Sequence, residues 1–168
     1  MTTETAIHSD PLFLRIDSLR LDEFETGLLP VLRHFLDSHT CPESQAWRHA
    51  YTIAAERWGD AVGLAAAHAL QNVVSALLAC RSGGIAYSDP LCLDSRELVT
   101  AEEAAFLRML HHMRRDQTAL ARNAVEELTG GLIDPHVVRA GLSLAHRFGC
   151  GAPAGSRAPG RPRLRVAG

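Results

Sequence analysis

The stretch AVGLAAAHALQNVVSALLACR, residues 61–81, sets the expected architecture of this chain. Wound as a helix, it is apolar on nearly every side, and a helix of that kind is normally buried all round. His68, Gln71 and Asn72 lie near its middle, so we expect these polar side chains to be interior groups as well. The other helices should therefore pack around residues 61–81 as a single-domain, all-α bundle of about five helices.

Periodicity and capping signals predict the remaining helices. A capping box at Thr40 and Glu43 predicts a helix start, and Gly59 predicts its end. A second capping box, at Thr100 and Glu103, predicts one long helix through 129. Asp134 followed by a proline predicts the start of the last helix. With a first helix kinked by its internal proline, the expected helices cover 23–37, 40–59, 61–81, 100–129 and 134–148.

The chain divides into three parts by composition. Residues 1–21 are ambiguous, because the alternation from Leu12 to Asp17 fits either a short extended segment or one helical turn. Residues 22–148 are predicted to form the helical domain. Residues 149–168 are rich in Gly, Pro, Ala and Arg, and we expect this tail to be disordered.

Composition narrows the class of protein. The chain has 168 residues, 46% hydrophobic and 21% charged, as expected for one globular domain. The four cysteines form no CxxC pair, and residues 1–10 do not resemble a signal peptide, so we expect a reducing cytoplasm. Residues 61–81 are long enough to span a membrane. The three polar residues at their midpoint and the lack of a second such segment argue against a membrane protein.

Charge is unevenly distributed, but it does not indicate a nucleic-acid partner. Residues 1–43 carry eight acidic and three basic residues, whereas residues 135–168 carry six Arg and no acid. Such a split is typical of an interaction tail, or of two ends that attract each other. The Arg residues of the tail alone would bind phosphates weakly and in a salt-sensitive way. No predicted helix has the composition of a recognition helix.

The nine histidines suggest metal binding, but their spacing does not. Helical metal sites usually place ligands at i and i+3 or i+4, and HxxxH, HExxH, ExxH and CxxC are all missing from the sequence. His39 and Cys41 could chelate one ion, yet two ligands do not make a site. The nucleotide-binding motifs and the GxSxG motif of hydrolases are missing too. We therefore predict no metal site, no cofactor and no identifiable catalytic group.

Two regions are candidates for binding a ligand or partner. The polar trio of the central helix either bonds to neighbouring helices, which we favour, or lines a pocket beneath residues 82–99. That long irregular segment is the other region, because loops often carry function. His112 adds a third feature, since it could pair with Asp116 on an exposed basic face. The predicted site residues are His68, Gln71, Asn72, Tyr87, Asp89, Asp94, Arg96 and His112.

Three functions follow from these features, and each belongs to a different class. The first hypothesis is a non-catalytic interaction or regulatory module of the bacterial cytoplasm with a protein partner. A homo-oligomer formed through the long helix 100–129 is left open. The second is a protein that binds a small molecule, a metal or haem through the trio and the 82–99 loop. The third is a small enzyme in which His68 or His112 works with a carboxylate of that loop.

Overall fold

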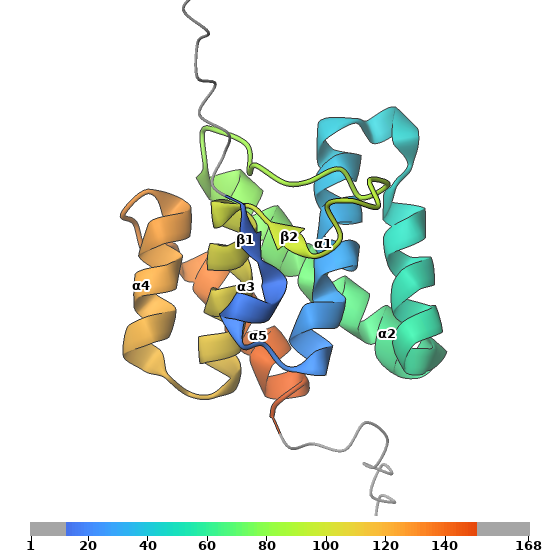
Figure 1. The fold of residues 1–168 in the computed structure, drawn as a ribbon. Helices are drawn as coiled ribbons and strands as arrows, with labels where there is room; N and C mark the ends of the chain where they lie inside the picture. Colours follow the sequence, from blue (N-terminus) through green and yellow to red (C-terminus); the bar gives the residue numbers. More distant parts are fainter. Residues whose placement is uncertain (1–12, 151–168) are drawn as a thin grey trace, which may run out of the picture.

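Five α-helices form the body of the protein in the computed structural model, which describes residues 13–150 (Figure 1). The all-α class and the number of helices expected from the sequence are thereby confirmed. Most of the predicted disordered tail, from residue 151 onward, lies outside the described residues, as do residues 1–12. The helices are α1 (Glu23–Thr40), α2 (Trp47–Cys80), α3 (Ala101–Arg114), α4 (Thr118–Thr129) and α5 (Pro135–Arg147).

Helix α2 consists of two segments joined at Gly59. The backbone of Gly59 has φ 76° and ψ 159°, values that interrupt the helix and that glycine adopts at little cost. The second segment then turns back and packs closely against the first. The approach is so close that a Cβ at Gly63 would overlap the carbonyl group of Ala54. The predicted break at Gly59 is therefore confirmed, and the small residue at 63 makes the close approach possible.

The second segment of α2 belongs to the core, but it is not buried on every side. Leu70, Val73, Val74 and Leu77 are fully buried against the other helices. One stripe faces solvent, and it includes His68 and Asn72, so the prediction that these two side chains are interior is wrong. Alanine explains the error, since a small methyl group is tolerated at the surface as readily as in the core. The exposed stripe comprises Ala61, Leu64, His68, Asn72, Ser75 and Ala79.

The predicted helix 100–129 is two helices, which is a second correction. Helix α3 ends at Arg114, Asp116 takes a left-handed φ of 54°, and α4 starts at Thr118 and packs back against α3. Aspartate is one of the few residues that enter this conformation without large strain. The chain turns here without the glycine or proline that would mark a turn in the sequence.

Two of the three helix starts predicted from capping signals are confirmed. Thr100 Oγ1 accepts a hydrogen bond from the Glu103 N–H at 3.0 Å, and Asp134 caps α5. Thr40 is not a cap: it is the last residue of α1, and its hydroxyl donates to the Leu36 carbonyl. A short 3₁₀ helix, η2 (Pro42–Ser44), follows, and α2 begins only at Trp47.

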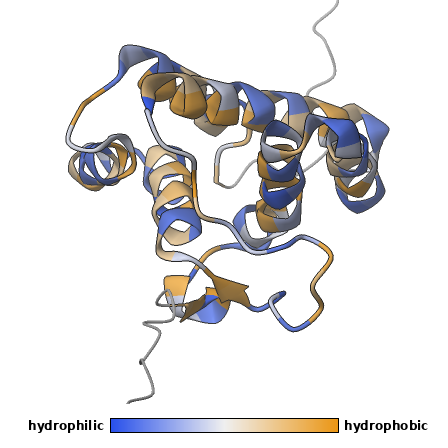
Figure 2. Cartoon of the chain, turned by 90° about the horizontal axis from the view of Figure 1, so that it is seen from above, coloured by the Kyte–Doolittle hydropathy of each residue, from blue (hydrophilic) through white to orange (hydrophobic). Residues whose placement is uncertain are grey.

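The ambiguous residues near the N-terminus contain both predicted structures. Strand β1 (Leu14–Arg15) leads directly into a 3₁₀ helix, η1 (Ile16–Leu19). Strand β1 pairs antiparallel with β2 (Leu98–Val99), with Leu14 opposite Val99. This pairing fastens the end of the 82–99 segment to the helical body. The rest of that segment has no regular structure, and one of its outward bends is hydrophobic (Figure 2).

Within the described residues, α2 is the helix that is long and apolar enough to cross a membrane, with a mean hydropathy of 1.5 over its best window. That measure uses length and composition alone. Of the residues in the window, 44% are buried inside the fold. Core helices of soluble proteins pass the same test.

Candidate ligand-binding cleft

A cleft of about 610 Å³ opens where the second half of α1, the start of α2 and the irregular 82–97 segment meet. Its size lies within the range of small-molecule sites in proteins. We call it the His34 cleft. Its lining consists of His34, Asp37, Ser44, Ala46, His49, Tyr87, Asp89, Pro90 and Leu91.

Local structure explains how these side chains meet. His34 and Asp37 are three residues apart on α1, so both face the same side of that helix. The chain then reverses through η2, where Gln45 takes a left-handed φ of 51°. This reversal brings Ser44 and His49 alongside α1. The 82–97 segment closes the third side of the cleft with Tyr87 and Asp89.

Hydrogen bonds hold the 82–97 segment in place beside α1. The Tyr87 hydroxyl donates to Asp37 Oδ1 at 3.2 Å. Thr100 Oγ1 donates to the Ala86 carbonyl at 2.7 Å, and the Ser88 N–H donates to Glu103 at 3.2 Å. The loop side of the cleft is therefore an ordered surface.

A buried ion pair next to the cleft connects α1 with α3. Arg33 Nε donates to Glu103 Oε1 at 2.7 Å, and the two side chains are 4% and 0% exposed. The same guanidinium donates to the carbonyls of Ser95 and Leu98, at 3.0 and 2.5 Å. Arg33 thus joins α1, α3 and the loop, and it fixes the backbone next to His34. The sequence carries no sign of this pair, because its members are 70 residues apart.

His34 is the unusual residue of the cleft. The residue is 6% exposed, and its Nδ1 atom is buried without a hydrogen-bond partner. Its ring centre lies 5.5 Å from that of His49. Burial, and secondarily His49, lower the pKa of His34 below 6.5, although Asp37 and Asp89 oppose the shift. The neutral imidazole is therefore favoured, with a ring nitrogen that no described residue uses.

The cleft is acidic. Asp37 and Asp89 line it, whereas none of its lining residues is Arg or Lys. Asp37 accepts hydrogen bonds from Tyr87 and from Ser44, the latter at 3.3 Å. Asp89 Oδ1 accepts one from the Leu91 N–H at 2.8 Å. The arrangement offers carboxylate and imidazole acceptors, so it suits a ligand with positive charge or with hydrogen-bond donors.

The predicted site residues do not form one site. Tyr87 and Asp89 line the His34 cleft, as a functional loop would require. Asp94 and Arg96 belong to the same segment but are exposed and do not line the cleft. The sequence signal for His34 and Asp37 was their i, i+3 spacing, which pairs a histidine with an acid on one helical face.

The remaining predicted residues lie elsewhere. His68 and Asn72 contact each other on the exposed stripe of α2, with 3.3 Å between Nε2 and Nδ2. Gln71 is half-buried and accepts a hydrogen bond from the Tyr51 hydroxyl at 2.8 Å. His112 pairs with Gln117 rather than with Asp116. Neither His68 nor His112 is hydrogen-bonded to a carboxylate of the 82–99 loop.

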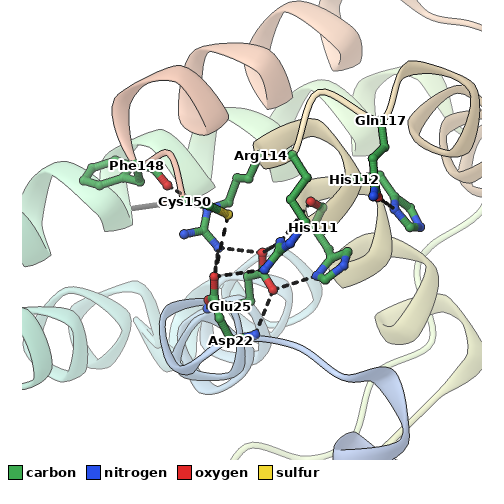
Figure 3. Close-up of polar contacts among 9 residues, drawn as sticks. Asp22, Glu25, His111, His112, Arg114, Gln117, Phe148 and Cys150 are labelled. Carbon is green, nitrogen blue, oxygen red and sulfur yellow. Dashed lines mark hydrogen bonds and ion pairs between the residues drawn. The ribbon is translucent and has the colours of Figure 1, made fainter. Parts of the chain in front are cut away.

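A second polar cluster lies at the opposite end of α1 (Figure 3). Glu25 is fully buried there, and its carboxylate contacts Arg114 and Arg115 at 2.5 Å and His111 at 2.9 Å. Asp22 forms a reciprocal capping box with Glu25 and also contacts both guanidinium groups. We call this group the Glu25 cluster. It comprises Asp22, Glu25, His111, Arg114 and Arg115.

The Glu25 cluster is a structural ion network. Burial alone would raise the pKa of Glu25, but the Asp22 backbone N–H, the imidazole and the two guanidinium groups outweigh it and lower that pKa from 4.5 to about 2. Potential ligand atoms of Asp22, Glu25 and Cys150 lie within 4.8 Å of one another. The guanidinium groups already neutralise both carboxylates, so a metal cation would meet positive charge there.

Comparison with known proteins identifies no relative. No protein-family model matches the chain, and neither the curated proteins nor the solved structures contain a match. Functional conclusions therefore depend on the geometry and charge of the His34 cleft.

Proposed function

We propose that the protein is a non-catalytic binding module whose His34 cleft takes a small, positively charged ligand. The observation that carries this proposal is the lining of the cleft, which combines two carboxylates with a buried, unpartnered imidazole and contains no Arg or Lys. A buried polar atom without a partner costs about 1–3 kcal/mol. A ligand that bonds to it would offset that cost.

The hydrogen bonding of the cleft favours binding over acid–base catalysis. A catalytic histidine is normally oriented by a second group, most often a carboxylate bonded to its other ring nitrogen. Among residues 13–150, no carboxylate is hydrogen-bonded to His34. The carboxylates instead bond to hydroxyl and backbone groups, which hold them as fixed acceptors.

Thermal denaturation with a ligand panel tests the proposal. The panel should contain putrescine, agmatine and choline, the chlorides of Mg²⁺, Mn²⁺ and Zn²⁺, and the anions phosphate and citrate. At a concentration 100 times its Kd, a ligand stabilises the fold by about 2.7 kcal/mol, which gives a clear rise in Tm. We expect at least one cation, and neither anion, to raise the Tm.

Variants on the same loop locate the effect. Asp89→Asn should abolish the rise in Tm, because it removes a carboxylate from the cleft. Asp94→Asn is the matched control, since it removes one charge from an exposed position outside the cleft. Stabilisation by anions alone, or by no cation at all, would contradict the proposal.

Protein interaction is a second candidate function, and two exposed leucines of the same loop favour it, of which Leu91 also lines the rim of the cleft. Leu91 and Leu93 are 77% and 66% exposed, the two highest values among the large hydrophobic side chains described. Large exposed hydrophobic side chains that form a contiguous patch are typical of a docking surface. We propose that this docking occurs in the reducing cytoplasm, with which the four free cysteines of the described chain are compatible.

A pull-down from the native host tests this second function. Wild-type protein should retain a partner that the Leu91→Ser/Leu93→Ser variant loses. Leu132→Ser is the control, because Leu132 is 62% exposed and lies between α4 and α5. Sedimentation velocity on the same proteins shows whether the partner is a second copy of the chain. Equal recovery with all variants would exclude docking through the loop.

A further inference from the structure

We propose that the ligand of the His34 cleft is a divalent transition-metal ion, held by His34 and His49 with a carboxylate of Asp37 or Asp89. This inference rests on the proposed function, because it names the cation that the acidic cleft would take. It assigns a metal site to four residues from three segments, of which His34 and Asp37 have i, i+3 spacing on one helix.

The separation of the two imidazoles is the first observation. With Zn–N distances of about 2.0–2.1 Å and tetrahedral angles, two histidines on one zinc ion hold their ring centres about 5 Å apart. The ring centres of His34 and His49 are 5.5 Å apart, and the ring planes are inclined at 40°. Two imidazoles from different helices are thus already at nearly the separation that a shared ion requires.

The state of His34 is the second observation. A histidine binds a metal through an unprotonated ring nitrogen. His34 is buried with Nδ1 unpartnered, so that nitrogen is not committed to another group of the described chain. An organic ammonium ion needs acceptors around it, but it gives no reason for two imidazoles to lie 5.5 Å apart in an acidic cleft. A borderline metal such as Zn²⁺, Co²⁺ or Ni²⁺ prefers this mixture of nitrogen and oxygen donors.

The two carboxylates can complete the ligand set in different ways. Asp37 is held by hydrogen bonds from Tyr87 and Ser44, the kind of support that orients a metal-ligating carboxylate. Asp89 is exposed on the loop and accepts a hydrogen bond from the Leu91 N–H, a contact that its side chain would give up on turning toward the imidazoles. Within the described part of the chain, three donors are already grouped at Asp22, Glu25 and Cys150 but not in the cleft. Metal binding should therefore move the loop that carries Asp89.

Isothermal titration of the full chain tests the inference. The protein should carry no His tag, be freed of metal with EDTA, and be titrated with ZnCl₂ and with CoCl₂. We expect one ion per chain, and a visible spectrum typical of tetrahedral Co²⁺. His34→Leu and His49→Leu should each weaken binding by about 100-fold or more, since loss of a first ligand exceeds the 10–100-fold typical of an outer-shell partner.

His39→Ala is the matched control. His39 lies exposed on the same helix, and with Cys41 it is the alternative pair of donors that the sequence offers. Binding should survive this substitution. Loss of binding in His39→Ala with retention in His34→Leu would overturn the assignment, as would unchanged binding in both cleft variants. Far-ultraviolet circular dichroism and Tm show that each variant is folded.

The amine panel separates failure of this inference from failure of the proposed function. If the wild-type chain binds an amine but neither metal, the inference is wrong and the cleft remains a cation site. If it binds neither amines nor metals, both proposals are wrong. A single bound metal ion that is lost in both cleft variants supports both.

Discussion

The two ends of α1 differ in whether their buried polar groups have hydrogen-bond partners. At the N-terminal end, both oxygens of Glu25 are paired, one with two guanidinium groups and the other with an imidazole and a backbone N–H. Near the C-terminal end, the buried His34 has an unpartnered nitrogen, and the hydroxyl of Ser88 on the 82–97 segment is unpartnered too. Paired groups hold the fold together, whereas unpaired ones lower its stability and are retained where something else binds to them.

Removing Glu25 should produce the largest effect. Glu25→Ala leaves Arg114 buried, with its side chain 5% exposed, and partly unpaired. Loss of one member of a buried ion pair costs about 3–5 kcal/mol. The free energy of unfolding from urea denaturation measures it. Glu23→Ala, an exposed acid in the same helical turn, should change that free energy by less than about 0.5 kcal/mol. Similar losses in the two variants would remove the contrast.

Acid should act on the same cluster. Because the pKa of Glu25 is about 2 in the folded protein and 4.5 ordinarily, the unfolded chain binds the proton more readily. The contribution of ionised Glu25 to the free energy of unfolding is complete above pH 4.5. It is lost as the pH falls toward 2, for a total of about 3 kcal/mol. Urea denaturation at a series of pH values measures how steeply the free energy of unfolding changes with pH. Glu25→Gln should flatten that dependence in this range, and an unchanged slope would show that other carboxyl groups cause the acid sensitivity.

A substitution at His34 should increase the free energy of unfolding, whereas those at Glu25 decrease it. His34→Leu replaces a buried imidazole that lacks a partner with an apolar side chain, and it should raise the free energy of unfolding by about 1 kcal/mol while abolishing ligand binding. His39→Leu, on the exposed end of the same helix, should change that free energy by less than about 0.5 kcal/mol. A loss of stability in His34→Leu would mean that His34 serves the core and not a ligand.

Local signals in the sequence predicted the parts of the fold that depend on single residues. Gly59 ends the first segment of α2 because only glycine takes its φ cheaply, and Thr100 and Asp134 start helices through their own side-chain oxygens. The turn at Asp116 was missed, because the hydrophobic stripe of α3 continues in phase into α4 and no glycine marks the break. Packing of the two helices against each other decides that turn.

The cleft required tertiary information that the sequence does not display. His34, His49 and Tyr87 lie on three different segments, and no spacing rule connects them. The loop residues Tyr87 and Asp89 were predicted because irregular segments carry function, but the helical residues opposite them were not. The polar trio of α2 was misjudged for a related reason, since an alanine-rich helix has no clear hydrophobic face from which to read the exposed side.

The smallest effects are expected on that exposed stripe, which adds a third kind of polar group to the comparison. Asn72→Ala removes a contact with His68 between two wetted side chains, and water replaces it. The free energy of unfolding should change by less than about 0.5 kcal/mol. Gln71→Ala, one position away, leaves the Tyr51 hydroxyl without its acceptor and should cost about 1 kcal/mol. Equal changes in the free energy of unfolding in the two variants would mean that exposure to water makes no difference between Gln71 and Asn72. Polar groups on this fold would then differ only by whether they are paired, and burial would carry no weight in the contrast between Glu25 and His34.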